Sequence, residues 1–273
     1  MNTLRKMFLN RSDKILLVLF LLTMILLVFL KFAGLRETNF NYLHTVFMTV
    51  IPAIGGGVGL YRMRQWGGHK SIIGKSMFFS SIGLLWWALG SLTWVFYNFI
   101  LHVDAPYPSI ADIGYGQVYL WWGIGIVMLT NATSIRYEAK KSREKIYFLC
   151  IPVVMAIVTY NFIFLQAHGG TLLYDNPLKV LTDIVYPLGD IVIITLVVLK
   201  SGSVFNFLGE RLRLPIIIFL LGLVLNYIAD FYFSYTTTVG LYYVGSMADV
   251  FFTAAIFMLS LGLSNLHPKL LED

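Results

Sequence analysis

Charged residues are scarce in this sequence, and their scarcity excludes a soluble globular protein. Only 12% of the 273 residues are Asp, Glu, Lys or Arg, whereas 58% are hydrophobic and 16% are aromatic. A chain of this composition has too few polar side chains to cover a water-exposed surface. We therefore expect residues 1–273 to form a single integral membrane domain whose main partner is the lipid bilayer.

The motifs of familiar enzymes and cofactor sites are also missing. The five histidines are scattered, without HExxH or a closely spaced pair, so zinc and haem have no local signature. The sequence has no Gly-x-Ser-x-Gly elbow, and the glycines at 55–57 lack the lysine of a phosphate-binding loop. The single cysteine, Cys150, excludes an internal disulfide. These absences leave no catalytic residue and no identifiable cofactor, and they favour a protein that is not an enzyme.

Long apolar runs are what the sequence has instead. A transmembrane helix needs about 20 apolar residues, and eight runs approach or exceed that length. The first is longer than the core of a signal peptide and lacks an Ala-x-Ala-like cleavage site. We predict an all-α bundle of eight transmembrane helices, at residues 14–32, 42–61, 73–101, 110–130, 145–165, 178–200, 212–234 and 242–266.

The distribution of basic residues predicts the orientation of this bundle. The net charge is +6, and short loops rich in Lys and Arg stay on the cytoplasmic side. Both termini are therefore predicted to lie inside. Because the charge sits in separate loops and not on one solvated face, we do not expect nucleic-acid binding. The basic segments are Arg5, Lys6, Arg11 and Lys14, then Arg62, Arg64, Lys70 and Lys75, then Arg136, Lys140, Lys141, Arg143 and Lys145, and then Lys200, Arg211 and Arg213.

One short segment occurs twice. Residues 108–112 read Pro-Ser-Ile-Ala-Asp and residues 245–249 read Gly-Ser-Met-Ala-Asp, each at the start of an apolar run. The copies lie four runs apart, and an even number of spans gives both halves the same orientation. The sequence thus predicts a parallel 4+4 internal repeat about an axis along the membrane normal, comprising residues 14–133 and 145–266. Chance similarity between apolar segments is the alternative.

The ionisable residues inside the predicted spans are all acidic. Without a basic partner in low dielectric, a carboxylate must either keep a proton or bind a cation. Asp183 and Asp190 share a helical face with Tyr186 between them, and Asn226 and Asp230 are spaced i,i+4. We expect a ligand- or proton-binding pocket formed by Asp112, Asp183, Tyr186, Asp190, Asn226, Asp230 and Asp249.

Two parts of that pocket have an alternative interpretation. Asp112 and Asp249 could simply cap their helices at the water interface. Trp86 and Trp87 could wall the pocket, although a place in the core or against lipid is the simpler expectation. Asp190 lies deepest within its span and is predicted to be the residue that holds the proton or cation.

Several of these segments resemble a known multi-span module over predicted spans three to eight. The module precedes diguanylate-cyclase or cyclic-di-GMP phosphodiesterase domains in bacterial signalling proteins. The resemblance implies a sensory protein of the bacterial inner (cytoplasmic) membrane. Because this sequence ends at Asp273 with no output domain, a separate signalling output protein would be its partner. The matching segments are residues 106–112, Tyr186-Pro187 with Asp190, Ala229-Asp230, residues 240–242, Gly245, Asp249 and His267-Pro268.

Two functions of different classes follow. The first is a sensor or ligand-binding protein with an outward-facing acidic pocket for a small cationic or polar ligand. The second is a proton- or cation-coupled transporter of small solutes, which the repeat and the acids near mid-membrane would suit. A transporter needs access from both sides, and the inner halves of the spans have few polar residues. The sensor is therefore favoured, and an intramembrane enzyme ranks third.

Overall fold

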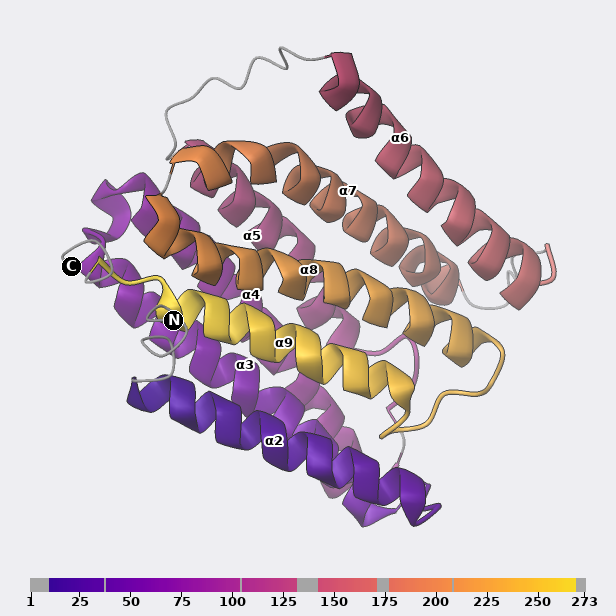
Figure 1. The fold of residues 1–273 in the computed structure, drawn as a ribbon. Coiled ribbons are helices and arrows are strands. Elements are labelled where there is room, and N and C mark those ends of the chain that lie inside the picture. Colours follow the sequence, from indigo (N-terminus) through magenta and orange to yellow (C-terminus); the bar gives the residue numbers. More distant parts are fainter. Residues whose placement is uncertain are drawn as a thin grey trace.

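The protein is an all-helical bundle. In the computed structural model the chain forms long helices joined by short connections, and no strand occurs in the residues that the structure describes. Figure 1 shows most of these helices packed side by side. The all-α fold expected from the sequence is thus confirmed. The described residues are 10–36, 38–103, 105–131, 142–170, 177–207 and 209–268, and within them the side chains of 130–149 and 199–211 are not described.

Each predicted span corresponds to one long helix. Seven of these helices are long and apolar enough to cross a membrane by length and composition. The eighth, α5, has 21 residues but contains Asp112 and Gln117. The helices are α2 (Arg11–Phe32), α3 (Asn39–Gln65), α4 (Ile72–Val95), α5 (Ala111–Asn131), α6 (Ser142–Thr159), α7 (Pro177–Phe207), α8 (Gly209–Thr238) and α9 (Met247–Asn265). The 3-10 turn η1 (Gly68–Lys70) precedes α4, and the π-helical segments η2 (Phe96–Ile100) and η3 (Tyr160–Ala167) continue α4 and α6.

The last helix begins later than the apolar run suggested. The run starts at residue 242, but α9 starts at Met247, and the intervening residues form a turn. Gly245 has a φ of 92°, a left-handed conformation that residues with a side chain rarely adopt. The turn therefore favours glycine there, and Tyr242 and Val244 lie in the segment before α9 and not in the helix.

The helices of the two sequence halves pack in a corresponding way. In the first half α3 packs on α4 and α4 on α5, and in the second half α7 packs on α8 and α8 on α9. The halves meet where α3 lies against α9 and α7 lies against α5. Helix α2 covers α3 and α9, whereas α6 packs mainly on α7 and stands at the edge of the bundle (Figure 1).

Small residues bring α3 and α9 close together. A Cβ added at Gly55 would lie 2.2 Å from the Oγ and 2.8 Å from the Cα of Ser260 in α9. Close approach through small residues is the usual way that membrane helices associate, because lipid gives them no hydrophobic driving force. The contact between α3 and α9 is therefore set by Gly55 and Ser260.

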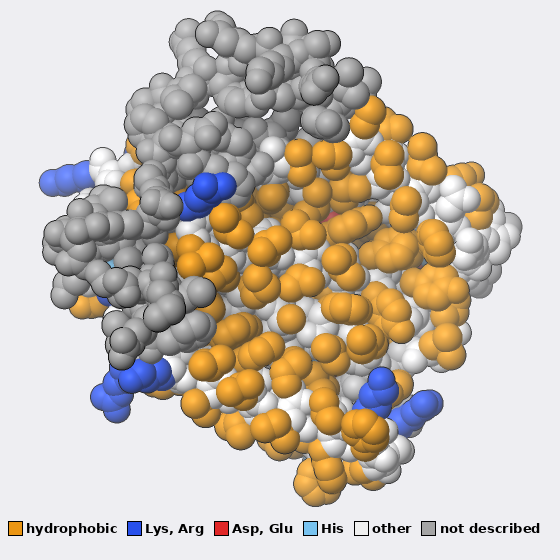
Figure 2. Space-filling model, in the orientation of Figure 1, with side chains coloured by type: hydrophobic (Ala, Val, Ile, Leu, Met, Phe, Trp, Pro, Cys, Tyr) orange, Lys and Arg blue, Asp and Glu red, His pale blue; other side chains and the backbone are white. Residues whose placement is uncertain are grey.

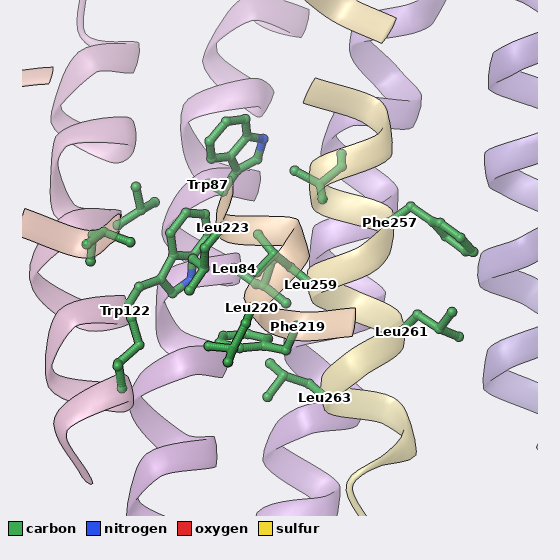
Figure 3. Packing of buried hydrophobic residues seen from close by; sticks show 14 of the residues in the cluster. Leu84, Trp87, Trp122, Phe219, Leu220, Leu223, Phe257, Leu259, Leu261 and Leu263 are labelled. Carbon is green, nitrogen blue, oxygen red and sulfur yellow. The ribbon is translucent and has the colours of Figure 1, made fainter. Parts of the chain in front are cut away.

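A layer of large apolar side chains fills the middle of the bundle. Leu84 and Trp87 of α4, Trp122 of α5, and Leu223 and Leu259 from α8 and α9 are all buried. The rings of Trp87 and Trp122 stack with centroids 6.0 Å apart. Figure 3 shows both tryptophans among the side chains of this layer. This packing fixes the helices that carry the polar residues described below.

The surface agrees with a lipid environment. Figure 2 shows hydrophobic side chains across the visible face, with Lys and Arg at its two ends. In α2, for example, Ile25 and Phe29 are more than half exposed. We conclude that this is a multi-pass membrane protein. The basic residues at 136–145, and Lys200 and Arg211, lie outside the described side chains.

Candidate ligand-binding site

The two copies of the repeated segment form the same kind of helix cap. Asp112 accepts a hydrogen bond from the backbone N–H of Ser109 at 2.6 Å, and Asp249 accepts one from that of Gly245 at 2.6 Å. Proline occupies position 108, which corresponds to Gly245, and proline has no N–H to donate. The donor is therefore one residue later in the first copy.

Each capping carboxylate also accepts a hydrogen bond from a tyrosine of another segment. Tyr186 of α7 donates to Asp112, and Tyr242 donates to Asp249 at 3.3 Å. Each carboxylate thus uses one oxygen for the backbone and the other for a phenol. The two caps hold Tyr186 and Tyr242 in place at the end of the bundle where α5, α7 and α9 begin, which we call the chamber end.

Both caps line a cavity of about 70 Å³, which we call the chamber. Its walls come from α3, α4, α5, α7, α8, α9 and the two loops that precede α5 and α9, so α2 and α6 take no part. Of the described residues that line it, the only charged ones are Asp112, Asp230 and Asp249, and none is Lys, Arg or His. The other lining residues are Thr45, Met48, Trp87, Ser91, Trp94, Pro106, Tyr107, Tyr115, Tyr186, Phe233, Tyr242, Val244 and Phe252.

Half of the residues around the chamber are aromatic, and their rings touch one another. Phe233 of α8 lies at the middle of this wall, with ring centroids 5.5 Å from Tyr107, 4.7 Å from Tyr242 and 6.0 Å from Phe252. Edge-to-face contacts of this kind stabilise the rings against each other beyond the area they bury. The aromatic wall is therefore preformed and does not depend on a ligand.

Trp87 adds an unused donor to the chamber wall. Its side chain is 3% exposed, and its indole N–H has no hydrogen-bond partner among the described residues. Leaving a buried donor unpaired costs about 1–3 kcal/mol. A water molecule or a ligand oxygen that reached this N–H would remove that cost.

Of the three chamber carboxylates, Asp230 is the one with an oxygen that accepts no hydrogen bond from a described residue. Tyr119 donates to its Oδ2 at 3.1 Å, and Asn226, one turn earlier on α8, donates to the same oxygen at 2.5 Å. No described residue donates to Oδ1 of Asp230. This oxygen therefore remains available to a ligand.

A second cavity of about 390 Å³, which we call the vestibule, adjoins the chamber. The two cavities share five lining residues, Trp94, Tyr107, Phe233, Tyr242 and Val244. The vestibule's other walls come from the ends of helices and from loops: Tyr42, Ala105, Lys179, Thr237 and Tyr243. The vestibule thus leads from the chamber towards the chamber end of the bundle.

Asp183 lies outside the chamber but is connected to its wall. Tyr107, which lines the chamber, donates to Asp183 Oδ1 at 2.9 Å, and His168 Nε2 lies 3.1 Å from Oδ2. Burial, and then the neighbouring Asp183 carboxylate, raise the pKa of the Tyr107 phenol above its ordinary value. A proton therefore stays on Tyr107, so that it can donate to Asp183.

Asp190 also lies outside the chamber. It is 3% exposed, and no described residue donates a hydrogen bond to it. With Asp230, Tyr186 and Tyr227 it lines a separate cavity of about 10 Å³, which has room for about one water molecule. Asp230 is thus the link between Asp190 and the chamber.

The structure therefore divides the expected pocket. Asp112, Tyr186, Asp230 and Asp249 line the chamber, and Asn226 reaches it through Asp230. Asp183 is hydrogen-bonded to Tyr107, and Asp190 shares a small cavity with Asp230, so both acids lie behind residues that line the chamber. Together these placements give a compact acidic site with a second layer of two carboxyl groups.

Two histidines beside this site had no signal in the sequence. His168 pairs with Asp183, and His44 of α3 is 1% exposed, with Nε2 3.0 Å from Thr253 Oγ1 and Nδ1 3.9 Å from Asp249 Oδ2. Each histidine comes from a different segment than its partner. Only the packing of α3 on α9, and of the end of η3 near α7, brings them together.

Among the described residues no group of three or more His, Cys, Asp or Glu side chains is arranged to hold a metal ion. Comparison of the chain with protein-family models, with characterised proteins and with solved structures gives no match. Its function must therefore be inferred from the chemistry of the chamber.

Proposed function

We propose that this protein is a membrane-embedded sensory or ligand-binding protein whose chamber opens to the outer side. The observation that supports this most is the chamber itself, with three carboxylates, a preformed aromatic wall and an adjoining vestibule. Ligand pockets are typically concave and largely apolar, with a few polar groups that fix the ligand's orientation. The chamber has these properties, and no arrangement for covalent catalysis accompanies them among the described residues.

The charges at the two ends of the bundle support the outward orientation. The end opposite the chamber carries Arg62 and Arg64 at the close of α3, Lys70 in η1 and Lys75 in α4. The chamber end has fewer basic residues, among them Lys31, Arg36 and Lys179. By the positive-inside rule, this asymmetry supports a chamber end that faces outward and chain termini that lie inside.

The parallel 4+4 repeat is part of this proposal. Its support is the matching caps at Asp112 and Asp249 and the corresponding packing of α3 on α9 and α7 on α5. A chamber between the two halves, with one capping acid from each, is what a pseudo-two-fold arrangement would produce.

In the sensory version of the proposal, the protein works with a separate signalling output protein. The resemblance to membrane modules of cyclic-di-GMP signalling proteins supports that version. Co-purification of a cyclase or phosphodiesterase whose activity changes with a chamber ligand would support it further.

A coupled transporter is the second candidate. The observation in its favour is the pair Asp190 and Asp230, which line one small cavity without a described Lys or Arg among its other lining residues. Such a pair could carry a proton. Transport would require the pair to become accessible from the opposite end as well.

The proposal is tested by a ligand screen on the purified protein in lipid nanodiscs. Ligand at 100 times its Kd should stabilise the protein by about 2.7 kcal/mol, and Trp94, which lines both cavities, should report binding by fluorescence. We expect Phe233→Ala to abolish the response. If no compound of any charge class binds, or if binding persists unchanged in Phe233→Ala, the chamber is not a ligand site. Uptake into proteoliposomes would instead identify the transporter.

A further inference from the structure

We propose that the chamber recognises an organic ammonium group, with the charged nitrogen on Oδ1 of Asp230 and the remainder of the ligand in the vestibule. This inference names the ligand class for the site proposed above and rests on that proposal.

The sign of the ligand's charge follows from the charged groups that face the chamber. Three carboxylates line it with no cationic side chain, and two of them already have both oxygens hydrogen-bonded. Only Asp230 retains an oxygen without a described donor, because both of its bonds go to Oδ2. A cation that donates a hydrogen bond completes this site, whereas an anion would meet carboxyl oxygens and no cationic side chain among the described lining residues.

The aromatic wall distinguishes an organic cation from an inorganic one. Ammonium groups bind favourably over the faces of Trp, Tyr and Phe, and aromatic cages are the common way to bind them. The chamber lining includes four such rings, those of Trp87 and Trp94 from α4, Phe233 from α8 and Tyr242 from the loop before α9. Inorganic cations prefer a shell of oxygen ligands, and most of the wall here is carbon.

The cavity volumes set the shape of the ligand. An engineered cavity of about 150 Å³ holds benzene, so the 70 Å³ chamber holds a small ammonium head but not an aromatic ring. The vestibule, at about 390 Å³, has room for a ring or a short chain. Its walls include Tyr42, Trp94, Tyr107 and Tyr243, which suit an apolar or aromatic body. The fitting ligand is therefore an amine with a compact head and an apolar body.

The test compares three probes of the same size by calorimetry in nanodiscs: 2-phenylethylamine, the neutral 2-phenylethanol and the anion phenylacetate. We expect the amine to bind and the two others to bind at least ten times more weakly. Equal binding of the alcohol would overturn the inference while leaving a ligand-binding chamber in place. Failure of all three, together with a negative general screen, would overturn the proposed function as well.

Two variants locate the charge. Asp230→Asn keeps the shape and a carbonyl oxygen for Tyr119 and Asn226, and it should weaken amine binding about 30-fold, which is about 2 kcal/mol at 1.4 kcal/mol per tenfold. The control is Asp13→Asn, which also neutralises a buried acid but lies at the opposite end, hydrogen-bonded to Ser264. It should leave amine affinity unchanged. An Asp230→Asn protein that binds the amine like the unmodified chain would refute the role of Asp230.

A third variant keeps the inference testable if Asp230→Asn does not fold. Trp94→Leu removes an aromatic ring from the lining of both cavities and should weaken amine binding about 3- to 10-fold. Trp94→Phe keeps an aromatic ring and should retain most of the affinity. If NaCl at the same concentration protects the protein as well as the amine does, the site binds inorganic cations and the inference is wrong.

Discussion

The contact between α3 and α9 makes a sharp prediction about stability, because two glycines on one helix differ only in what lies beside them. A methyl group at Gly55 would lie 2.2 Å from Ser260 Oγ and 2.8 Å from its Cα, whereas one at Gly57 would meet nothing within 4 Å. The Ser260 side chain can rotate away, but its Cα cannot. Gly55→Ala therefore requires α3 and α9 to separate, and Gly57→Ala does not.

The size of the stability difference follows from one effect that the two variants share and one that applies only at Gly55. Alanine is favoured over glycine in a helix by about 0.8–1.0 kcal/mol, and both variants gain this. Overpacking costs about 1–3 kcal/mol and applies only at Gly55. Gly57→Ala should thus equal or exceed the original protein in stability, and Gly55→Ala should be less stable than Gly57→Ala by about 1–3 kcal/mol.

The assay is reversible unfolding by SDS in mixed micelles, followed by tryptophan fluorescence. Ser260→Gly removes the Oγ and Cβ that the new methyl meets, so the double variant should recover part of the loss. Because α3 and α9 both line the chamber, Gly55→Ala should also weaken the binding of any ligand in the chamber. Equal stability of the two single variants would mean that α3 and α9 do not meet at Gly55.

Three further predictions concern topology, the buried acid and pH. In a Cys150→Ser background, a cysteine at the exposed Leu241 should react with an impermeant thiol reagent in intact cells, and one at the exposed His69 should not; the reverse labelling would overturn the inside location of the termini. Asp190→Asn should fold nearly as well as the original chain because it resembles a protonated carboxyl, whereas Asp190→Lys should unfold at lower SDS, and equal stabilities would show that Asp190 is not enclosed. Because the pKa of Tyr107 is raised in the folded protein, its neutral phenol contributes fully to stability below about pH 10, the usual tyrosine pKa. This contribution is lost as the pH rises further. Tyr107→Phe should accordingly reduce the loss of stability at alkaline pH, and an unchanged alkaline profile would contradict the buried position of its phenol.

The sequence predicted the helices well because their signal is local. Eight apolar runs became eight long helices, since a run of apolar residues needs no knowledge of its neighbours to be recognised. The ends were less accurate where turn geometry decides them, as at Gly245, whose positive φ delays the start of α9. The repeated Ser-x-Ala-Asp segment also identified two of the three chamber acids.

The composition of the chamber could not be predicted, because it depends on contacts between distant segments. Phe233, Tyr242 and Trp94 come from three segments, and nothing in their spacing indicates that they share a wall. Trp87, for which a core position was the simpler expectation, is both buried in the core and part of the chamber lining. Asp190 was expected to be central because of its depth in the span, yet Tyr186 on the same helix is the residue that lines the chamber.

The hydrogen bonds of Tyr107 connect the interior of the bundle with its periphery. This phenol belongs to the chamber wall, bonds to Asp183 on α7, and through it is joined to His168 at the end of η3. The helix that leads into η3 is α6, which packs mainly on α7 and has few other neighbours. Any displacement of the Tyr107 ring must either break this chain of bonds or move Asp183 and His168 with it. These hydrogen bonds therefore join the chamber wall to the segment that continues α6, the helix at the edge of the bundle.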